Sequence, residues 1–240
     1  MSLFSKAGCP LPPARREWID GRWRFLLREF GDGPAARSPV VVPTADFFPG
    51  GYRPTRAGVR RLFPRVARWM GLDPGSIRLV LSGPRRASGR GLAFAFAGTV
   101  SGWYRGGRPP RVALHAARFD DPVAVVGTLA HELGHVHLLG ARRVAPEAED
   151  HEPLTDLLTV FFGLGVFRAH GLASASRPRG VAARAGFPVQ ETGYLDALHF
   201  GYAMALHARL RGEGEDAPWA AYLPPAVRAA FERSTRFLRA

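Results

Sequence analysis

The pattern His-Glu-x-x-His occupies residues 131–135, inside a long apolar run. Residues four apart on an α-helix lie on one face, about one turn apart, so a helix here would present the imidazoles of His131 and His135 to a single ion. Glu132 would lie roughly 100° around the helix from His131, beside that ion and not on it. A chain with eight His and ten Glu would contain roughly 0.01 such patterns by chance. The pattern therefore predicts a helix that carries part of a metal site.

The residues around this pattern favour a buried helix. Asp121 suits the N-cap and Pro122 the first helical position, while Gly140 stands where a glycine would end the helix. Between these ends, apolar residues recur at helical spacing, namely Val123, Val125, Val126, Leu129, Leu133, Val136, Leu138 and Leu139. Two histidines at this spacing are typical of a zinc site, in which the glutamate takes a proton from a water that the metal activates. The alternative is an amphipathic core helix with two hydrogen-bonded histidines.

A third ligand has to come from elsewhere, because hydrolytic zinc sites usually have three protein ligands and one open position. The metzincin arrangement would need Gly at 138 and His at 141, but the chain has Leu138 and Ala141. Glu152 and Asp156 are four residues apart, so on a helix one carboxylate could bind the metal while the other accepts the N–H of a ligating histidine. An ordinary acidic cluster at a helix N-terminus would also explain this run. Further candidates within the run are His151 and Glu149.

Together these two segments resemble the gluzincin class of metallopeptidases, which includes thermolysin-like enzymes and the compact ImmA/IrrE-type and minigluzincin proteins. In that class a His-Glu-x-x-His helix is completed by a Glu on a later helix, often with an Asp one turn after it. The resemblance covers roughly a quarter of the chain and implies an α+β, zincin-like fold, with a small mixed sheet packed on the active-site helix and a mostly helical C-terminal part. It implies a Zn²⁺ site in which His131, His135 and Glu152 are the ligands, Glu132 is the general base and Asp156 is the hydrogen-bond partner of a ligand histidine.

The resemblance also implies a zinc metallopeptidase that acts on a peptide or protein substrate. Such an enzyme needs a hydrogen-bond donor, opposite the metal, for the oxyanion of the tetrahedral intermediate. The candidates are Tyr194, His199 and Tyr202, of which the last two share a helix face. A buried Tyr bonded to the backbone is the alternative. The strand expected directly before the metal helix, residues 111–115, has an edge that could pair with an extended peptide and hold it over the zinc.

Hydrophobic periodicity predicts the remaining elements. Helices are expected at residues 17–30, 55–70, 157–167 and 193–210, and from residue 225 onward. Strands are expected at residues 40–42, 77–81, 92–100 and 111–115, with a hairpin loop at residues 102–107 and a longer loop at residues 173–188. His137 should point away from the metal, because it lies about 200° around the helix from His135. We expect residues 1–50 to be an N-terminal extension that packs on the body, and residues 51–240 to form a single domain.

The net charge of +13 suggests a nucleic-acid partner. However, 32 of the 33 basic residues are arginine, which indicates a compositional bias, and only Lys6 is lysine. Arginine pairs are scattered along the chain without interleaved aromatic residues, at positions 15–16, 60–61, 85–86 and 142–143. The sequence therefore allows a nucleic-acid partner without favouring one. Two alternatives to a peptidase stay open: a metal-bearing regulatory or interaction module, and an arginine-rich nucleic-acid-binding protein with a structural zinc.

The sequence predicts neither a membrane protein nor a disulfide-bonded one. Cys9 is the only cysteine, so the chain has no internal disulfide. Residues 1–13 contain Lys6 but no apolar run like that of a secretory signal. The longest apolar stretch, residues 157–167, is too short to cross a bilayer. We therefore expect a cytoplasmic protein.

Overall fold

The longer helices begin where the sequence supplies a cap or a proline. In the computed structural model, which describes residues 8–48, 50–83, 102–175 and 195–239, Thr55 Oγ1 accepts a hydrogen bond from Gly58 N at 3.0 Å and caps one helix. Asp121 Oδ1 accepts from Ala124 N at 2.9 Å and caps the next, with Pro122 at the first helical position as predicted. The helices are α1 (Pro13–Phe30), α2 (Gly33–Arg37), α3 (Arg56–Trp69), α4 (Pro122–His135), α5 (His151–Phe161), α6 (Gly165–Ala175), α8 (Ala197–Leu210) and α9 (Pro225–Arg239). Over these residues the fold is α+β, mostly helical with one small sheet.

In the described part of the chain the sheet has three strands in the order β1-β3-β2, which are β1 (Arg78–Ser82), β2 (Gly102–Arg105) and β3 (Arg111–His115). β3 lies in the middle, parallel to β1 and antiparallel to β2. The prediction of a hairpin loop over residues 102–107 was wrong in its first four residues, because Trp103 and Tyr104 favour a strand. The expectation that residues 111–115 offer a free edge was also wrong. Within the described residues, β2 is the edge strand nearest in sequence to α4.

Two further predictions were wrong. Residues 40–42 form no strand, and Val41 N instead donates to Gly163 O at 2.8 Å, which ties this segment to the helical body. The apolar run 157–167 is not one helix, because α5 ends at Phe161 and α6 begins at Gly165. Gly163 has a φ of 79°, a left-handed conformation that breaks the run. The loop predicted at residues 173–188 was wrong in its first three residues, which continue α6, and the rest of it, like the strand predicted at residues 92–100, lies outside the described residues.

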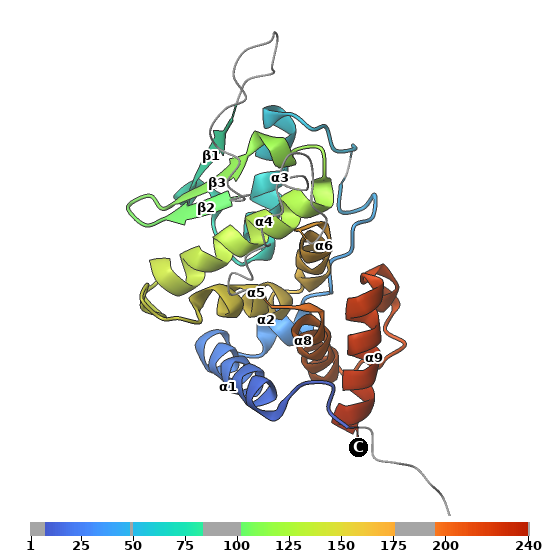
Figure 1. Cartoon of the computed structure of the whole chain (residues 1–240). Coiled ribbons are helices and arrows are strands. Elements are labelled where there is room, and N and C mark those ends of the chain that lie inside the picture. The colour runs from blue at the N-terminus through green and yellow to red at the C-terminus, as the bar shows by residue number, and fades with distance from the viewer. Residues whose placement is uncertain (1–7, 49, 84–101, 176–194, 240) are drawn as a thin grey trace, which may run out of the picture.

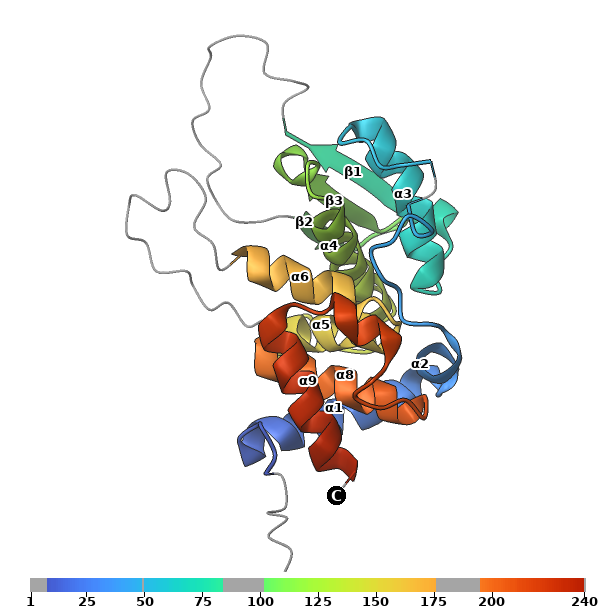
Figure 2. The ribbon, with the colours of Figure 1, turned by 90° about the vertical axis from the view of Figure 1, so that its right-hand side faces the viewer.

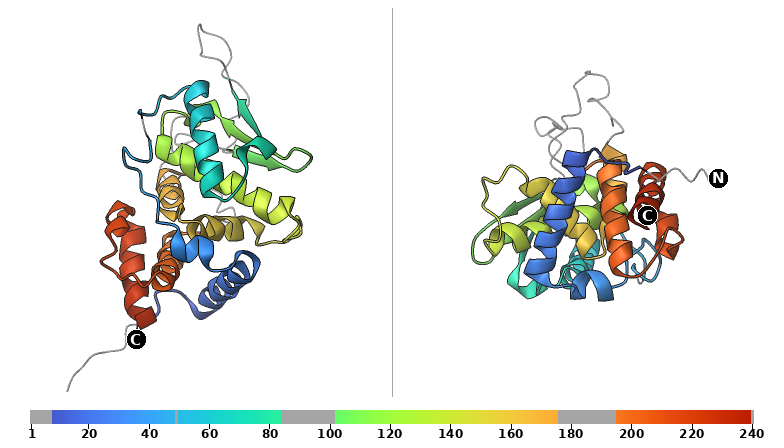
Figure 3. Two further views of the ribbon diagram at one scale, coloured as in Figure 1. Left: turned by 180° about the vertical axis from the view of Figure 1, so that it is seen from behind. Right: turned by 90° about the horizontal axis from the view of Figure 1, so that it is seen from below.

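The elements form a sheet-bearing half and a helical half, with α4, α5 and α6 between them (Figure 1). α3 and α4 contact each other and cover one face of the sheet, while α1, α8 and α9 lie at the opposite end of the molecule (Figures 1 and 2). Seen from below, α1 and α8 run side by side against the helical body (Figure 3). Buried residues of both halves join in one hydrophobic core, to which α1 contributes Ile19, Trp23 and Leu26. None of the described helices has the length and apolar character needed to span a bilayer.

One buried histidine in the helical half gives a prediction for stability. His207 on α8 is fully buried, and neither of its ring nitrogens has a hydrogen-bond partner within the described residues. Burial, together with nearby Arg211, lowers the pKa of His207 from 6.5 to about 3. Between those pH values the imidazole of His207 is protonated in the unfolded chain and neutral in the folded chain. The free energy of unfolding should therefore fall as the pH drops below 6.5, by about 1.4 kcal/mol per pH unit from this group.

Urea unfolding of the metal-free protein at several pH values would measure this effect. In the variant His207→Phe, which keeps a ring beside Trp23, the slope between pH 6.5 and about pH 4.5 should be reduced relative to the wild type. Identical slopes in the two proteins would show that His207 does not limit stability in acid.

Candidate metal centre

The two halves of the site lie on α4 and α5, which cross closely. His131 and His135 are on one face of α4 and are 4% and 5% exposed, so both imidazoles are enclosed. Gly134 lies at the crossing, where a Cβ atom would be only 2.7 Å from Thr155 Cγ2 of α5. A glycine is therefore needed for α5 to approach α4. This approach brings Glu152, in the first turn of α5, to the two histidines.

His131, His135 and Glu152 form a cluster that could hold a metal ion. One potential ligand atom from each lies within 4.8 Å of the others. Glu152 Oε2 is 2.9 Å from His131 Nε2 and 3.5 Å from His135 Nε2. Tetrahedral zinc with ligands at about 2.1 Å would separate its ligand atoms by about 3.4 Å. The two nitrogens and one oxygen are atoms of the kinds that ligate divalent metals, and the two distances from Glu152 Oε2 lie on either side of this spacing.

The other nitrogen of each imidazole is held from behind. His131 Nδ1 donates to Asp156 Oδ1 at 2.7 Å, and Arg168 Nε donates to the same carboxylate at 2.5 Å. His135 Nδ1 lies 3.3 Å from the hydroxyl of Thr155. These contacts fix the ring orientations and leave both Nε2 atoms directed at Glu152. Asp156 therefore lies behind His131, and Glu152 is the carboxylate of the cluster.

The charges in the site are strongly coupled. Burial would raise the pKa of Glu152, but hydrogen bonds from His131 and His135 hold it well below its usual range. Burial would likewise raise the pKa of Asp156, but Arg168 and His131 lower it. For His131, burial would lower the pKa, but Asp156 and Glu152 raise it to about 9. Burial lowers the pKa of His135. Two anionic carboxylates thus face the imidazoles, an arrangement that suits a cation.

Glu132 lies beside this cluster, against the sheet. Its residue is 6% exposed, and burial raises the pKa of its carboxyl group to about 7. A Cβ atom on Gly102 would lie 2.9 Å from Glu132 Oε1, so the carboxylate faces the start of β2. Glu132 is not a member of the His131, His135 and Glu152 cluster. Its place next to the cluster and next to the edge strand leaves it available for proton transfer.

Two of the predicted oxyanion donors, Tyr202 and His199, lie in the described residues, and both contact carboxylates away from the cluster. Tyr202 is 1% exposed and its hydroxyl donates to Asp20 Oδ1 at 3.0 Å. His199 Nδ1 contacts Asp196 Oδ1 at 2.6 Å. These side chains serve contacts between α8 and the N-terminal segment or within α8 itself. Tyr194 lies outside the described residues.

Two other histidines lie near the site, one directed away from it and the other at its border. His137 was expected to point away from the metal, and its Nε2 donates to Met70 O at 2.6 Å while its ring stacks on Phe162, which confirms that expectation. His151 was an alternative ligand, and its Nδ1 is 3.6 Å from Glu152 Oε1. Its ring centroid is 5.7 Å from that of His135, so it borders the cluster from the start of α5.

Sequence reasoning missed Tyr104, which lies on the edge strand at the site. Its ring centroid is 5.9 Å from that of His135. Tyr104 pairs with Val112 of β3, so its side chain points to the sheet face covered by α4, and burial raises the pKa of its hydroxyl. The sequence signal for a strand here was the aromatic pair Trp103 and Tyr104, but these residues were interpreted as part of a hairpin loop. Among the tyrosines that the structure describes, Tyr104 has its ring in contact with a histidine of the cluster.

Comparison with known proteins adds no relative, since no family model, curated protein or solved structure matches the chain. The function has to be inferred from the chemistry and geometry of the site.

Proposed function

We propose that the protein is a zinc-dependent hydrolase, and specifically a peptidase of gluzincin type. The observation that carries this proposal is the convergence of His131 Nε2, His135 Nε2 and Glu152 Oε2, with the carboxylate of Glu132 beside them. Zinc, when bound there, would polarise a carbonyl and lower the pKa of water to about 7. A site with three protein ligands leaves one position open for substrate, as hydrolytic zinc sites require.

The residues of the chain have separate tasks in this hydrolysis. Glu132 accepts a proton from the attacking water and returns it to the leaving amine, which is general acid–base catalysis by one carboxylate. Asp156 keeps the Nδ1–H of His131 directed away from the metal position, and Arg168 holds Asp156 in place. Tyr104, whose ring lies beside that of His135, is the candidate donor from β2 to the developing oxyanion, and its hydroxyl, which lies next to Gly140, would have to turn toward the metal position to donate.

The edge of β2 favours an extended peptide as the substrate. Within the described residues β2 pairs on one side only, with β3. An extended peptide could add to its other side through main-chain hydrogen bonds. Because Gly102 faces Glu132 and Tyr104 contacts His135, a peptide on this edge would run past the metal cluster. This replaces β3, the strand expected to do so from the sequence.

Metal content tests the proposal. The untagged wild type, purified and dialysed with zinc, should hold close to one zinc per chain by elemental analysis. His131→Ala and Glu152→Ala should lose it, whereas Glu149→Ala, which changes an exposed carboxylate of the same acidic run, should keep it. The zinc-loaded protein is then incubated with a mixed peptide library, and cleavage products are identified by mass spectrometry. A wild type that takes up no zinc would refute the site, and a zinc protein that hydrolyses nothing would refute the peptidase.

Tyr104→Phe should slow hydrolysis without loss of zinc. The substitution removes only the hydroxyl, and removal of one oxyanion donor typically costs about 10²-fold in kcat. The control is Tyr202→Phe, which removes a hydroxyl bonded to Asp20 and should leave kcat within about twofold. Steady-state kinetics with zinc analysis of each variant would compare them. Loss of activity in Tyr202→Phe instead would return the donor role to α8.

A further inference from the structure

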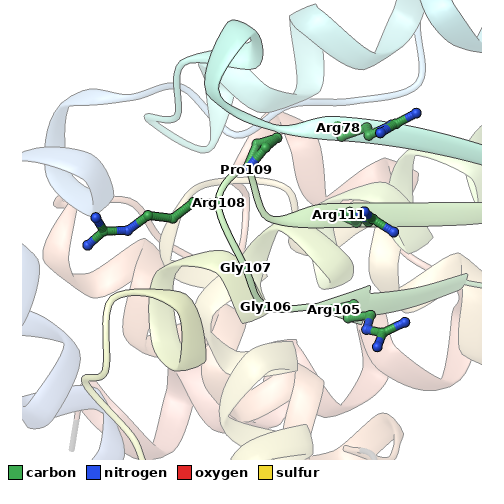
Figure 4. A pocket seen from close by; sticks show the side chains of 7 residues that line it. All are labelled: Arg78, Arg105, Gly106, Gly107, Arg108, Pro109 and Arg111. Atoms are coloured by element: carbon green, nitrogen blue, oxygen red, sulfur yellow. The ribbon is translucent and has the colours of Figure 1, made fainter.

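The outer face of the sheet carries a row of three arginines. Arg78 on β1 pairs with Arg111 on β3, and Arg111 pairs with Arg105 on β2. Residues that pair across strands place their side chains on the same face, about 4.8 Å apart from strand to strand. Figure 4 shows the three side chains extending in the same direction, with Arg108 of the connecting loop pointing away from them. The row therefore crosses all three strands at one end of the sheet.

Among the residues that the structure describes, no carboxylate forms an ion pair with this row. All three arginines are exposed, and the ion pairs among the described residues use other arginines. Like charges directly opposite on neighbouring strands destabilise a sheet. The three side chains border a hollow of about 240 Å³ at this end of the sheet. An unneutralised row of this kind is suited to an anionic ligand.

An exposed indole stands next to the row. Trp103 is two residues before Arg105 on β2, so both side chains point to the outer face, and Trp103 is 39% exposed. It is one of two exposed large hydrophobic side chains in the described part of the chain. Indole faces stack on unpaired bases, and guanidinium groups bind phosphates in a bidentate manner. Cation and aromatic ring thus lie on the same face of β2.

We propose that this outer sheet face binds single-stranded nucleic acid, with phosphates on Arg78, Arg111 and Arg105 and a base stacked on Trp103. The row runs across the strands, so it suits a chain of regularly spaced charges that crosses the sheet. A peptide added to the β2 edge would run along the strands and could reach only Arg105. The net charge of +13 would assist binding from a distance.

This surface is separate from the metal cluster. On β2, Gly102 and Tyr104 face α4, whereas Trp103 and Arg105 face the opposite way. The two sites therefore share a strand but lie on opposite faces of the sheet. The inference does not rest on the proposed peptidase function, and its test needs no zinc chemistry.

Fluorescence anisotropy with labelled 12-nucleotide oligothymidine and oligouridine tests the inference. We expect the full-length protein to bind at least one of them at low salt. The triple variant Arg78→Gln, Arg105→Gln and Arg111→Gln should bind at least tenfold more weakly, and the slope of log K against log salt should fall by about 2, which corresponds to three lost phosphate contacts. Trp103→Ala alone should weaken binding roughly tenfold.

A matched variant controls for net charge. Arg24→Gln, Arg28→Gln and Arg209→Gln removes the same charge from exposed positions on α1 and α8, at the other end of the molecule (Figure 1). It should bind like the wild type, and circular dichroism should show all variants folded. Equal losses of affinity in both triple variants would show that net charge, and not the arginine row, determines binding. Preference for a duplex of the same length, or equal affinity for polyglutamate, would also overturn the proposal, the latter in favour of an acidic peptide.

Discussion

Glu132→Gln is expected to abolish peptide hydrolysis while the protein keeps its zinc. The amide cannot accept the proton of the attacking water, and it cannot return that proton to the leaving amine. Because one carboxylate serves both steps, we expect kcat to fall by about 10⁴-fold, at the upper end for general acid–base groups. Zinc should stay because Glu132 is outside the cluster of His131, His135 and Glu152.

Two other Glu-to-Gln variants make this result specific. Glu152→Gln replaces the carboxylate between the two imidazoles and should lose both zinc and activity. Glu149→Gln changes an exposed carboxylate and should lose neither. Elemental analysis and single-turnover cleavage of an identified peptide would be measured on the same preparations. If Glu132→Gln retains full activity, the carboxylate beside the cluster is not the base and the mechanism is wrong.

Local spacing predicted the parts of the site that one helix determines. His131 and His135 are four residues apart, and the caps at Asp121 and Pro122 fix the helix that carries them. The partner side chains depend on how two helices cross, which is set by Gly134 against Thr155 and could only be guessed from the Glu152 and Asp156 spacing. The resemblance to gluzincins supplied that guess. The geometry now separates the two carboxylates, since Asp156 contacts Nδ1 of His131 and Glu152 contacts Nε2.

Features that depend on strand register were missed. Tyr104 reaches His135 because β2 pairs with β3, and a loop interpretation of the same residues hid this. The arginine row likewise gathers Arg78, Arg105 and Arg111 from three separate strands. None of these three arginines is next to another arginine in the chain, because residues that are adjacent across a sheet need not be adjacent in sequence. Apolar composition also could not place the break between α5 and α6, since residues 154–167 are all buried and show no change of pattern at the break.

Asp156→Ala is expected to cause the largest loss of stability among the site variants. Asp156 is fully buried and accepts hydrogen bonds from His131 Nδ1, Arg168 Nε and, at 3.4 Å, Leu195 N. Its removal leaves the Arg168 guanidinium, whose side chain is 13% exposed, without this buried carboxylate. Loss of one partner from a buried ion pair costs about 3–5 kcal/mol. Urea unfolding of metal-free protein would measure this difference.

The same variant distinguishes the two carboxylates as zinc ligands. Loss of a group that orients a ligand histidine weakens metal binding by about 10- to 100-fold, whereas loss of a ligand should prevent stoichiometric binding. We therefore expect Asp156→Ala to bind zinc weakly in a chelator competition and Glu152→Ala to bind none. Glu152→Ala should cost the metal-free chain less stability than Asp156→Ala, because the Glu152 side chain is 34% exposed whereas that of Asp156 is fully buried. The reverse result, with zinc lost in Asp156→Ala and kept in Glu152→Ala, would make Asp156 the ligand. The α4–α5 crossing would then have to rearrange when the metal binds, because Asp156 now lies behind His131.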